Sequence, residues 1–178
     1  MKVFVSVGLP TEVKDELYKV QKLISPSLAK IKWVPKKNLH LTLKFIGEVE
    51  NINEIHEKLS EIKFKPFNIK LGKFEMRSKG KYTNKNYSAL LWSNVEPHDK
   101  IIELQQEVDS ELFSGYQKFF PHITLGRIKM VKKEKEFLEL IKGIEIKPIE
   151  FEVNSFQLMQ SKLSKDGSKY IVLKKYKS

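Results

Sequence analysis

The sequence predicts an α+β protein of two similar lobes, each an antiparallel sheet with helices outside, and a central cleft between the two sheets. Three observations lead to this prediction. Stretches with the alternation of half-buried strands are interleaved with stretches that have the apolar spacing of helices. The order strand, helix, strand, helix, strand is followed by much the same order again. Each half also contains one His-x-Thr strand, and no long linker separates the halves, so residues 1–178 should form a single two-lobed domain.

The first half of the chain begins with a strand in which three valines alternate with other residues. Thr11 follows as a candidate N-cap for a helix with amphipathic spacing, which ends near Pro26. A second amphipathic helix lies between two later strands. In order, the expected elements are a strand at residues 2–8, a helix at 11–24, strands at 32–34 and 40–46, a helix at 51–62 and a strand at 67–76.

The second half opens with residues 77–86, which are polar and basic and include glycine, so an exposed loop is expected there. Pro97 is a suitable first residue for the helix after the next strand. A hairpin turn is expected at Lys165-Asp166-Gly167. In order, the expected elements are a strand at 87–95, a helix at 97–112, a strand at 119–129, a helix at 132–142 and strands at 144–159 and 170–176.

One short motif occurs twice, as His40-Leu41-Thr42-Leu43 and as His122-Ile123-Thr124-Leu125. On a strand, the His and Thr side chains of each copy lie on one face, roughly 6.5–7 Å apart along it, and the apolar side chains face the core. The chain contains only four His and four Thr. Two such pairs therefore arise by chance in roughly three of a thousand shuffled sequences. We interpret the two copies as one site.

Two histidines that face each other across a cleft can act as an acid–base couple, because the ordinary pKa of histidine is about 6.5. One would deprotonate an attacking water, and the other would protonate a leaving oxygen. The threonine hydroxyls could donate to the non-bridging oxygens of a phosphodiester, and no metal is required. The alternatives are a structural role for each histidine, or a zinc site at His40 and His122, for which no third ligand is evident. We leave His56 and His98 outside the site, as a packing or surface residue and an exposed residue.

Arginine usage gives a second indication, because only Arg77 and Arg127 among the 33 basic residues are arginine. A retained arginine suggests that a planar, bidentate donor is needed, as in phosphate binding. Arg127 lies five residues after His122, and an odd spacing on a regular strand points the two side chains to opposite faces. Arg127 can therefore bind the same phosphate only if a bulge or a strand end intervenes. Arg77 falls in the expected basic loop, where solvation is favoured over substrate contact.

The composition restricts the classes of function further. With 33 basic and 22 acidic residues, the net charge of +11 favours phosphate-rich partners, although a general lysine bias of the proteome is an alternative cause. The absence of cysteine excludes disulfides, thiol catalysis and Cys-ligated zinc. No stretch approaches the ~20 apolar residues of a membrane span, and the start lacks the shape of a signal peptide. We expect a monomeric, cytoplasmic protein without membrane contact, cofactor or metal.

Several segments together resemble the 2H phosphoesterase family, in its RNA 2′,3′-cyclic phosphodiesterase (2′-5′ RNA ligase-like) branch. The resemblance covers nearly the whole chain, and the two extended motifs are its most specific part. The segments are Lys2-Val3-Phe4-Val5, Trp33-Val34, Asn38-Leu39-His40-Leu41-Thr42-Leu43-Lys44-Phe45-Ile46-Gly47-Glu48, Phe120-Pro121-His122-Ile123-Thr124-Leu125-Gly126-Arg127 and, near the end, Ser161-Lys162-Leu163, Gly167 and Tyr170.

The resemblance implies a bilobal α+β fold and metal-independent hydrolysis of RNA 2′,3′-cyclic phosphate ends to 2′-phosphate. His40 would protonate the departing 3′ oxygen, and His122 would activate water. Thr42 and Thr124 would hold the phosphoryl oxygens, and Arg127 matches the arginine that follows the second motif in the family. The implied partners are RNA ends or oligonucleotides, tRNA fragments included. The alternatives are a reversible 2′-5′ RNA ligase and an RNA- or nucleotide-binding module on the same fold.

Two positions are less settled by the resemblance. Phe45, five residues after His40, would contact the terminal base, and ordinary core packing is an equal alternative. Relatives often carry a basic residue near the start of the strand that contains Trp92, where this chain has Ser88-Ala89-Leu90. This departure puts substrate contacts from that strand in doubt, and Lys81 or Lys85 in the preceding loop are candidate substitutes.

Overall fold

The computed structural model describes residues 1–79, 88–112, 118–165 and 167–178. In these ranges the chain forms nine strands and four α-helices. The elements are β1 (Lys2–Gly8), α1 (Thr11–Lys22), β2 (Ala29–Trp33), a 3-10 turn (Lys36–Asn38), β3 (His40–Glu48), α2 (Ile52–Ser60), β4 (Phe67–Lys79), β5 (Ser88–Glu96), α3 (Asp99–Glu111), β6 (His122–Val131), α4 (Glu134–Lys142), β7 (Glu150–Val153), β8 (Ser155–Ser164) and β9 (Gly167–Lys177).

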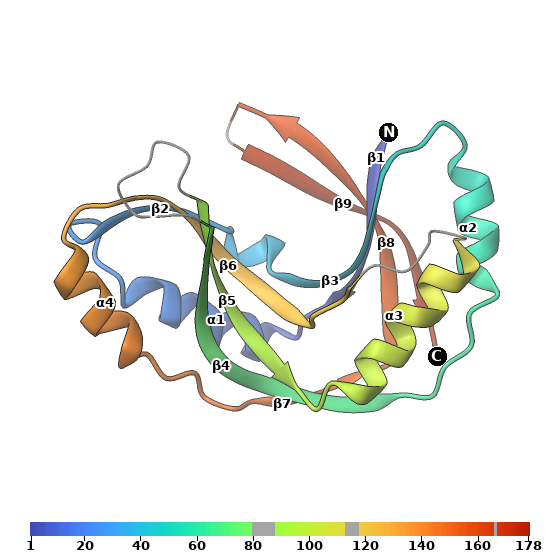
Figure 1. The fold of residues 1–178 in the computed structure, drawn as a ribbon. Coiled ribbons are helices and arrows are strands. Elements are labelled where there is room, and N and C mark those ends of the chain that lie inside the picture. Colours follow the sequence, from blue (N-terminus) through green and yellow to red (C-terminus); the bar gives the residue numbers. More distant parts are fainter. Residues whose placement is uncertain (80–87, 113–117, 166) are drawn as a thin grey trace.

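The strands pair antiparallel in the order β7-β4-β5-β6-β3-β1-β8-β9, and β2 pairs with β6 beside this path. Between β3 and β6 the register contains a single pair, Leu41 with Ile123. This weak junction divides the sheet into two lobes (Figure 1). We call them the His40 lobe (β3, β1, β8 and β9) and the His122 lobe (β7, β4, β5, β6 and β2).

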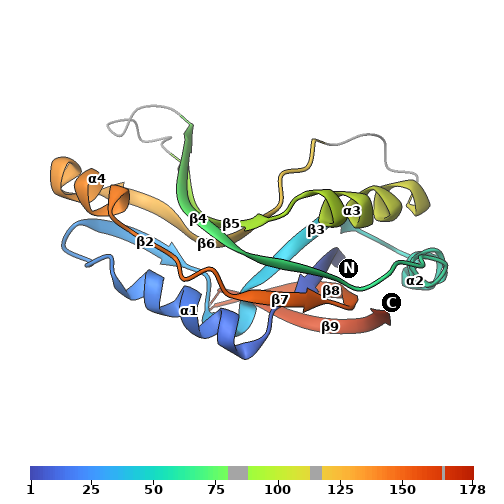
Figure 2. The same cartoon turned by 90° about the horizontal axis from the view of Figure 1, so that it is seen from below.

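The helices cover the lobes pairwise. Helices α2 and α3 lie beside the His40 lobe, where α3 packs on β3 and α2 on β9. Helix α1 contacts β6, and Figures 1 and 2 show α1 and α4 beside the His122 lobe. The apolar residues of both motifs are almost fully buried and anchor β3 and β6 in the hydrophobic core. These are Leu41, Leu43, Ile123 and Leu125, with exposed fractions of 3% or less. The prediction of an α+β fold with two lobes is confirmed.

The lobes do not coincide with the two halves of the sequence. The first half contributes β2 and β4 to the His122 lobe, and the C-terminal hairpin β8–β9 completes the His40 lobe. Helix α1 follows a strand of one lobe and packs against the other. The duplication is therefore visible in the order of elements and in the motifs, whereas the pairing of strands exchanges segments between the halves.

Some predicted boundaries were wrong. Residues 144–149 are not a strand, and β7 begins only at Glu150. Helix α3 begins at Asp99 rather than at Pro97. Thr11 is the first residue of α1, and no side-chain cap bond is formed there. Arg77 belongs to β4 and not to a loop.

Other expectations concern segments outside the described residues. Lys81 and Lys85 lie there, as does Asp166, the middle residue of the predicted turn. Beside it, Gly167 has a φ of +114°, which favours glycine. None of the helices in the described ranges is long and apolar enough to cross a membrane.

Candidate active site

A bulge occurs at the same position of both motif strands, directly after the threonine. In β3, Ser6 pairs with Thr42 and Val5 pairs with Lys44, so Leu43 is the extra residue. In β6, Leu125 is the extra residue between the pairs that involve Thr124 and Gly126. Each bulge leaves two consecutive residues buried and reverses the alternation that follows. The predicted interruption between His122 and Arg127 is confirmed.

Because of the bulges, the residue five positions after each histidine returns to the histidine's face of the sheet. This face lines a cleft of about 540 Å³ between the lobes. The cleft contains all six residues predicted for the site: His40, Thr42, Phe45, His122, Thr124 and Arg127. Its lining also includes Lys44, Arg77 and Lys118, and none of its described lining residues is acidic. The cleft is therefore suited to an anion such as a phosphodiester.

His40 is held by hydrogen bonds at both ring nitrogens. Its Nδ1–H donates to the Asn38 carbonyl at 2.7 Å, and Nε2 lies 2.9 Å from the Thr42 hydroxyl. Its ring packs against those of Phe4 and Tyr170, at centroid distances of 5.0 and 5.4 Å, and these two rings also contact each other at 5.1 Å. Burial lowers the pKa of His40, with smaller contributions in the same direction from the positive charges of Lys14 and His122, while the Asn38 carbonyl raises the pKa.

His122 repeats part of this arrangement in the other lobe. Its Nδ1–H donates to the Phe120 carbonyl at 2.7 Å. Its ring packs against Trp92, with the ring centroids 4.5 Å apart. Burial is again the largest cause that lowers the pKa of His122, the Phe120 carbonyl raises it, and the charge of Arg77 lowers it. In both histidines the carbonyl fixes the proton of the neutral ring on Nδ1, so Nε2 is the atom that can accept a proton.

Phe45 is 70% exposed and lines the cleft, so the alternative of core packing is wrong. Its ring contacts Phe4, which in turn packs on His40. The second bulge is fixed from behind by α1. The side-chain amide of Gln21, which is 4% exposed, donates to the carbonyl of the bulged Leu125 at 2.9 Å. The same carbonyl also accepts the backbone N–H of Val34 at 2.9 Å, so two donors from outside the β5–β6 pair bind the bulged residue.

Gly126 follows the second bulge and lies against β2. A Cβ atom at this position would come within 2.7 Å of Trp33 Cε3 and 2.9 Å of Ile31 Cγ2. Glycine is therefore required here by the close approach of β2 and not by a special backbone angle. In the first motif strand the equivalent position is Lys44, whose buried ammonium forms an ion pair with Asp109 of α3 at 2.8 Å.

Sequence reasoning did not assign Trp92, Tyr170, Lys14 or Arg77 to the site. Of these, Trp92 and Tyr170 pack directly on the two histidines. Arg77 was expected to be solvated in a loop, but it lines the cleft, and its guanidinium lies 5.8 Å from the centroid of the Trp92 ring. The available signal for a role in the site was that Arg77 is one of only two arginines in the chain. Arg77 is the cross-strand partner of Leu90. The start of β5, which has no basic residue, therefore has a cation beside it on β4.

The other two histidines lie outside the cleft lining. His56 Nδ1 lies 3.0 Å from the Tyr176 hydroxyl, in keeping with its expected packing role. His98 precedes α3 and is half-buried against Phe120, with ring centroids 5.4 Å apart, so the expectation that it is exposed was wrong. Among the described residues, no three His, Asp or Glu side chains are grouped closely enough to bind a metal ion.

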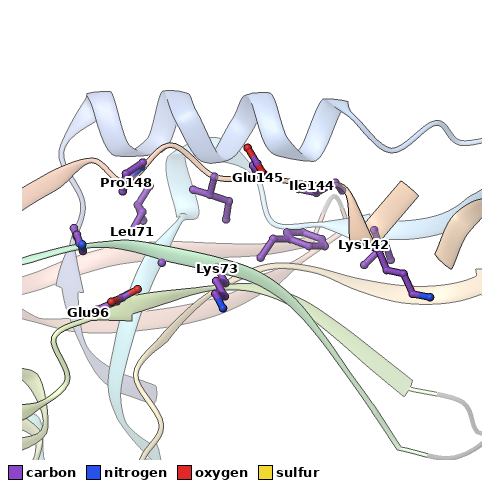
Figure 3. Close-up of a pocket in the computed structure, with 12 residues that line it drawn as sticks. Leu71, Lys73, Glu96, Lys142, Ile144, Glu145 and Pro148 are labelled. Atoms are coloured by element: carbon purple, nitrogen blue, oxygen red, sulfur yellow. The ribbon is translucent and has the colours of Figure 1, made fainter. Parts of the chain in front are cut away.

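A second groove, of about 550 Å³, lies between β4 and the segment that leads from the end of α4 to Pro148. Figure 3 shows its mixed lining, with Leu71, Ile144 and Pro148 beside the charged Lys73, Glu96, Lys142 and Glu145. None of the residues predicted for the site lines this groove. The cleft that contains both histidines is the candidate active site.

Comparison with known proteins identifies the family of the chain. The profile of the family described as LigT like Phosphoesterase matches residues 7–82 and 92–170 and thus includes both motif strands. The chain is 32% identical to an RNA 2′,3′-cyclic phosphodiesterase of Methanocaldococcus jannaschii, over 99% of this chain and 100% of the relative. It is 34% identical to a protein of the same name from Thermotoga maritima, over 97% of this chain and 93% of the relative.

Solved structures have the same fold. The TT0787 protein of Thermus thermophilus superposes with a TM-score of 0.72 at 26% identity, over 99% of this chain and 97% of that chain. Escherichia coli LigT in its apo form gives a TM-score of 0.74 at 22% identity, over 99% of this chain and 96% of that chain. With the sequence match over most of its length and the shared fold, the chain belongs to the LigT-like phosphoesterase family, a family of hydrolases.

Proposed function

We propose that the protein hydrolyses RNA 2′,3′-cyclic phosphate ends to 2′-phosphates by a metal-independent acid–base mechanism, with His40 as the acid and His122 as the base. The observation that carries the proposal is the paired geometry of the two histidines. In each, Nδ1 is bound to a backbone carbonyl two residues upstream, and both rings line one basic cleft. The relatives named RNA 2′,3′-cyclic phosphodiesterase support the choice of substrate.

In the proposed reaction, a water oxygen attacks the phosphorus while Nε2 of neutral His122 accepts the proton of the water. The bond between phosphorus and the 3′ oxygen breaks, and Nε2–H of protonated His40 gives its proton to that oxygen. The products are a 2′-phosphate and a 3′-hydroxyl. The hydroxyls of Thr42 and Thr124 and the guanidinium of Arg127 donate to the non-bridging oxygens, where negative charge increases in the transition state.

The proposal extends to the setting of the reaction. The single two-lobed domain would act as a cytoplasmic monomer on RNA ends or oligonucleotides, tRNA fragments included, with Phe45 against the terminal base. Its 70% exposure leaves the aromatic face available for stacking. Light scattering in solution tests the monomeric state, and a stable dimer would contradict it.

The direct test is incubation of the purified protein with an RNA that ends in a 2′,3′-cyclic phosphate, in the presence of EDTA, with the product identified by phosphorus NMR. We expect a 2′-phosphate. A 3′-phosphate product would overturn the assignment of the leaving oxygen, and loss of activity in EDTA would overturn the metal-free mechanism. Binding without turnover would identify an RNA-binding module, and joining to an added 5′-hydroxyl RNA would identify a 2′-5′ ligase.

A further inference from the structure

We propose that Arg77 and Trp92 are positioning residues for His122, in which the indole holds the imidazole in place and the guanidinium, in contact with the indole, disfavours a second positive charge beside it. The inference rests on the proposed function, because that function makes His122 the general base. The two residues come from neighbouring strands of the His122 lobe, β4 and β5. Neither is required to touch the substrate.

The three side chains are linked by two contacts with the Trp92 ring. The Trp92 and His122 rings are 4.5 Å apart between centroids, with an angle of 37° between their planes. Arg77 Cζ lies 5.8 Å from the Trp92 centroid, within the range of a cation–π contact. Glu75 fixes the indole itself, because it is the cross-strand partner of Trp92 and its carboxylate accepts the Nε1–H at 3.1 Å.

These contacts restrict the motion that the hydrogen bond of His122 leaves open. The bond from Nδ1–H to the Phe120 carbonyl holds one edge of the imidazole, but the ring can still tilt about that bond. The Trp92 ring prevents the tilt on one side, and Trp92 is only 5% exposed, so it has little freedom of its own. The Phe120 ring also packs on Trp92, at 6.0 Å between centroids. The position of Nε2 in the cleft is therefore set by the indole.

The charge of Arg77 acts in the direction that a general base needs. A nearby cation disfavours a second positive charge on the imidazole, and the charge of Arg77 lowers the pKa of His122 together with the larger effect of burial. Glu75 is the acidic residue on the same strand as Arg77. Its carboxylate is bound by the indole N–H.

Other charged groups also line the cleft near His122. Arg127 lies on the same strand, Lys118 precedes that strand, and His40 lies across the junction on β3. Among these charges, that of Arg77 lowers the pKa of His122, and the Arg77 guanidinium contacts the aromatic ring on which His122 packs.

The test is an NMR titration of the histidine side chains, assigned with His→Gln variants, in the wild type and in Arg77→Met. The pKa of His122 should rise toward its ordinary value in Arg77→Met, and the pKa of His40 should stay unchanged. Lys142→Met, which removes one positive charge in the second groove, should move neither histidine. An unchanged pKa of His122 in Arg77→Met would overturn the role of the guanidinium. This experiment needs no catalysis, so it separates the inference from the proposed function.

Kinetics test the role of the indole. Trp92→Leu should lower kcat by about 10–100-fold with a smaller change in KM, because the base is misplaced while the phosphate contacts remain. Trp92→Phe keeps an aromatic face but loses the bond to Glu75 and one of the two indole rings, and it should recover most of this loss. Circular dichroism shows whether both variants are folded. Full kcat in folded Trp92→Leu, or equal losses in the two variants, would overturn the positioning role.

Discussion

The two histidine strands share a backbone arrangement but differ in the residues that follow it. In both, a carbonyl two residues upstream holds Nδ1, a threonine lies two residues downstream, and a bulge follows the threonine. The fourth residue after the histidine is Lys44 in one strand and Gly126 in the other. The fifth is Phe45 in one strand and Arg127 in the other. The shared part places the two histidines, and the differing part makes their surroundings unequal.

The packing behind each strand explains the difference at the fourth position. Behind β3 lies α3, whose Asp109 pairs with the buried Lys44. Beside β6 lies β2, whose Trp33 occupies the space that a side chain at Gly126 would need. The two lobes can therefore keep one motif geometry although different elements support it. The comparison leads to four predictions, from the largest effect to the smallest.

The shared part predicts equal and large losses for the two histidines. His40→Ala and His122→Ala should each lower kcat by about 10²–10⁴-fold, because each removes one partner of a proton transfer. His56→Ala, which lies outside the cleft lining, serves as the control and should keep wild-type turnover of a cyclic-phosphate RNA. Full turnover in either cleft variant would show that the two strands do not act as a couple.

The fourth position predicts losses of stability that have different causes in the two strands. Lys44→Met leaves the carboxylate of Asp109 without its buried cation and should lower the free energy of unfolding by about 3 kcal/mol. Gly126→Ala adds a methyl group against Trp33 and Ile31 and should cost about 1–3 kcal/mol by overpacking. Urea denaturation measures both.

The control for the ion pair is the double variant Lys44→Met/Asp109→Leu, which should recover much of the loss because no unpaired charge remains. If Lys44→Met alone matched the wild type, the buried pair would contribute nothing to the His40 lobe.

The fifth position predicts different kinetic effects in the two strands. Arg127→Met should lower kcat/KM by about 10–100-fold, because charge-assisted hydrogen bonds to the phosphoryl group are lost. Arg127→Lys keeps the charge and should recover only part of it. Phe45→Ala should cost about tenfold, mainly in KM, through lost base stacking. A larger effect of Phe45→Ala than of Arg127→Met on a mononucleotide substrate would reverse the proposed roles.

The smallest effects concern pH. The pKa values of His40 and His122 both lie below the ordinary value of 6.5. In the proposed mechanism the active form has a protonated His40 and a neutral His122, so the pair carries one proton in all. The maximum of kcat/KM should therefore lie below pH 6.5. Removal of the cation in Lys14→Met should raise the pKa of His40, so the acid stays protonated to higher pH and the alkaline limb moves upward.

Arg77→Met should instead raise the pKa of His122, so the base becomes neutral only at higher pH and the acid limb moves upward. The two variants thus act on opposite limbs of one pH profile. If Lys14→Met moved the acid limb, the assignment of His40 as acid and His122 as base would have to be exchanged.

Much of the site follows from the sequence because its information is local. Alternation of polar and apolar residues placed each histidine and threonine on one face of a strand, and the odd spacing to Arg127 required a bulge. Phe45 was ambiguous, since its position relative to the core depends on the bulge at Leu43, which no local pattern marks. Thr11 and Pro97 were misassigned at helix starts because several adjacent residues satisfy the same end preferences.

The sequence by itself thus determined the two motif strands, the α+β class and the histidines and threonines that the cleft brings together. Only the tertiary structure decided which strands form each lobe, because hydrogen-bond partners far apart in the chain are chosen by packing and not by local propensity. The same holds for Trp92 and Arg77 at His122 and for Tyr170 and Lys14 at His40. They lie between 26 and 130 residues from the histidines that they adjoin, and no spacing in the sequence joins them.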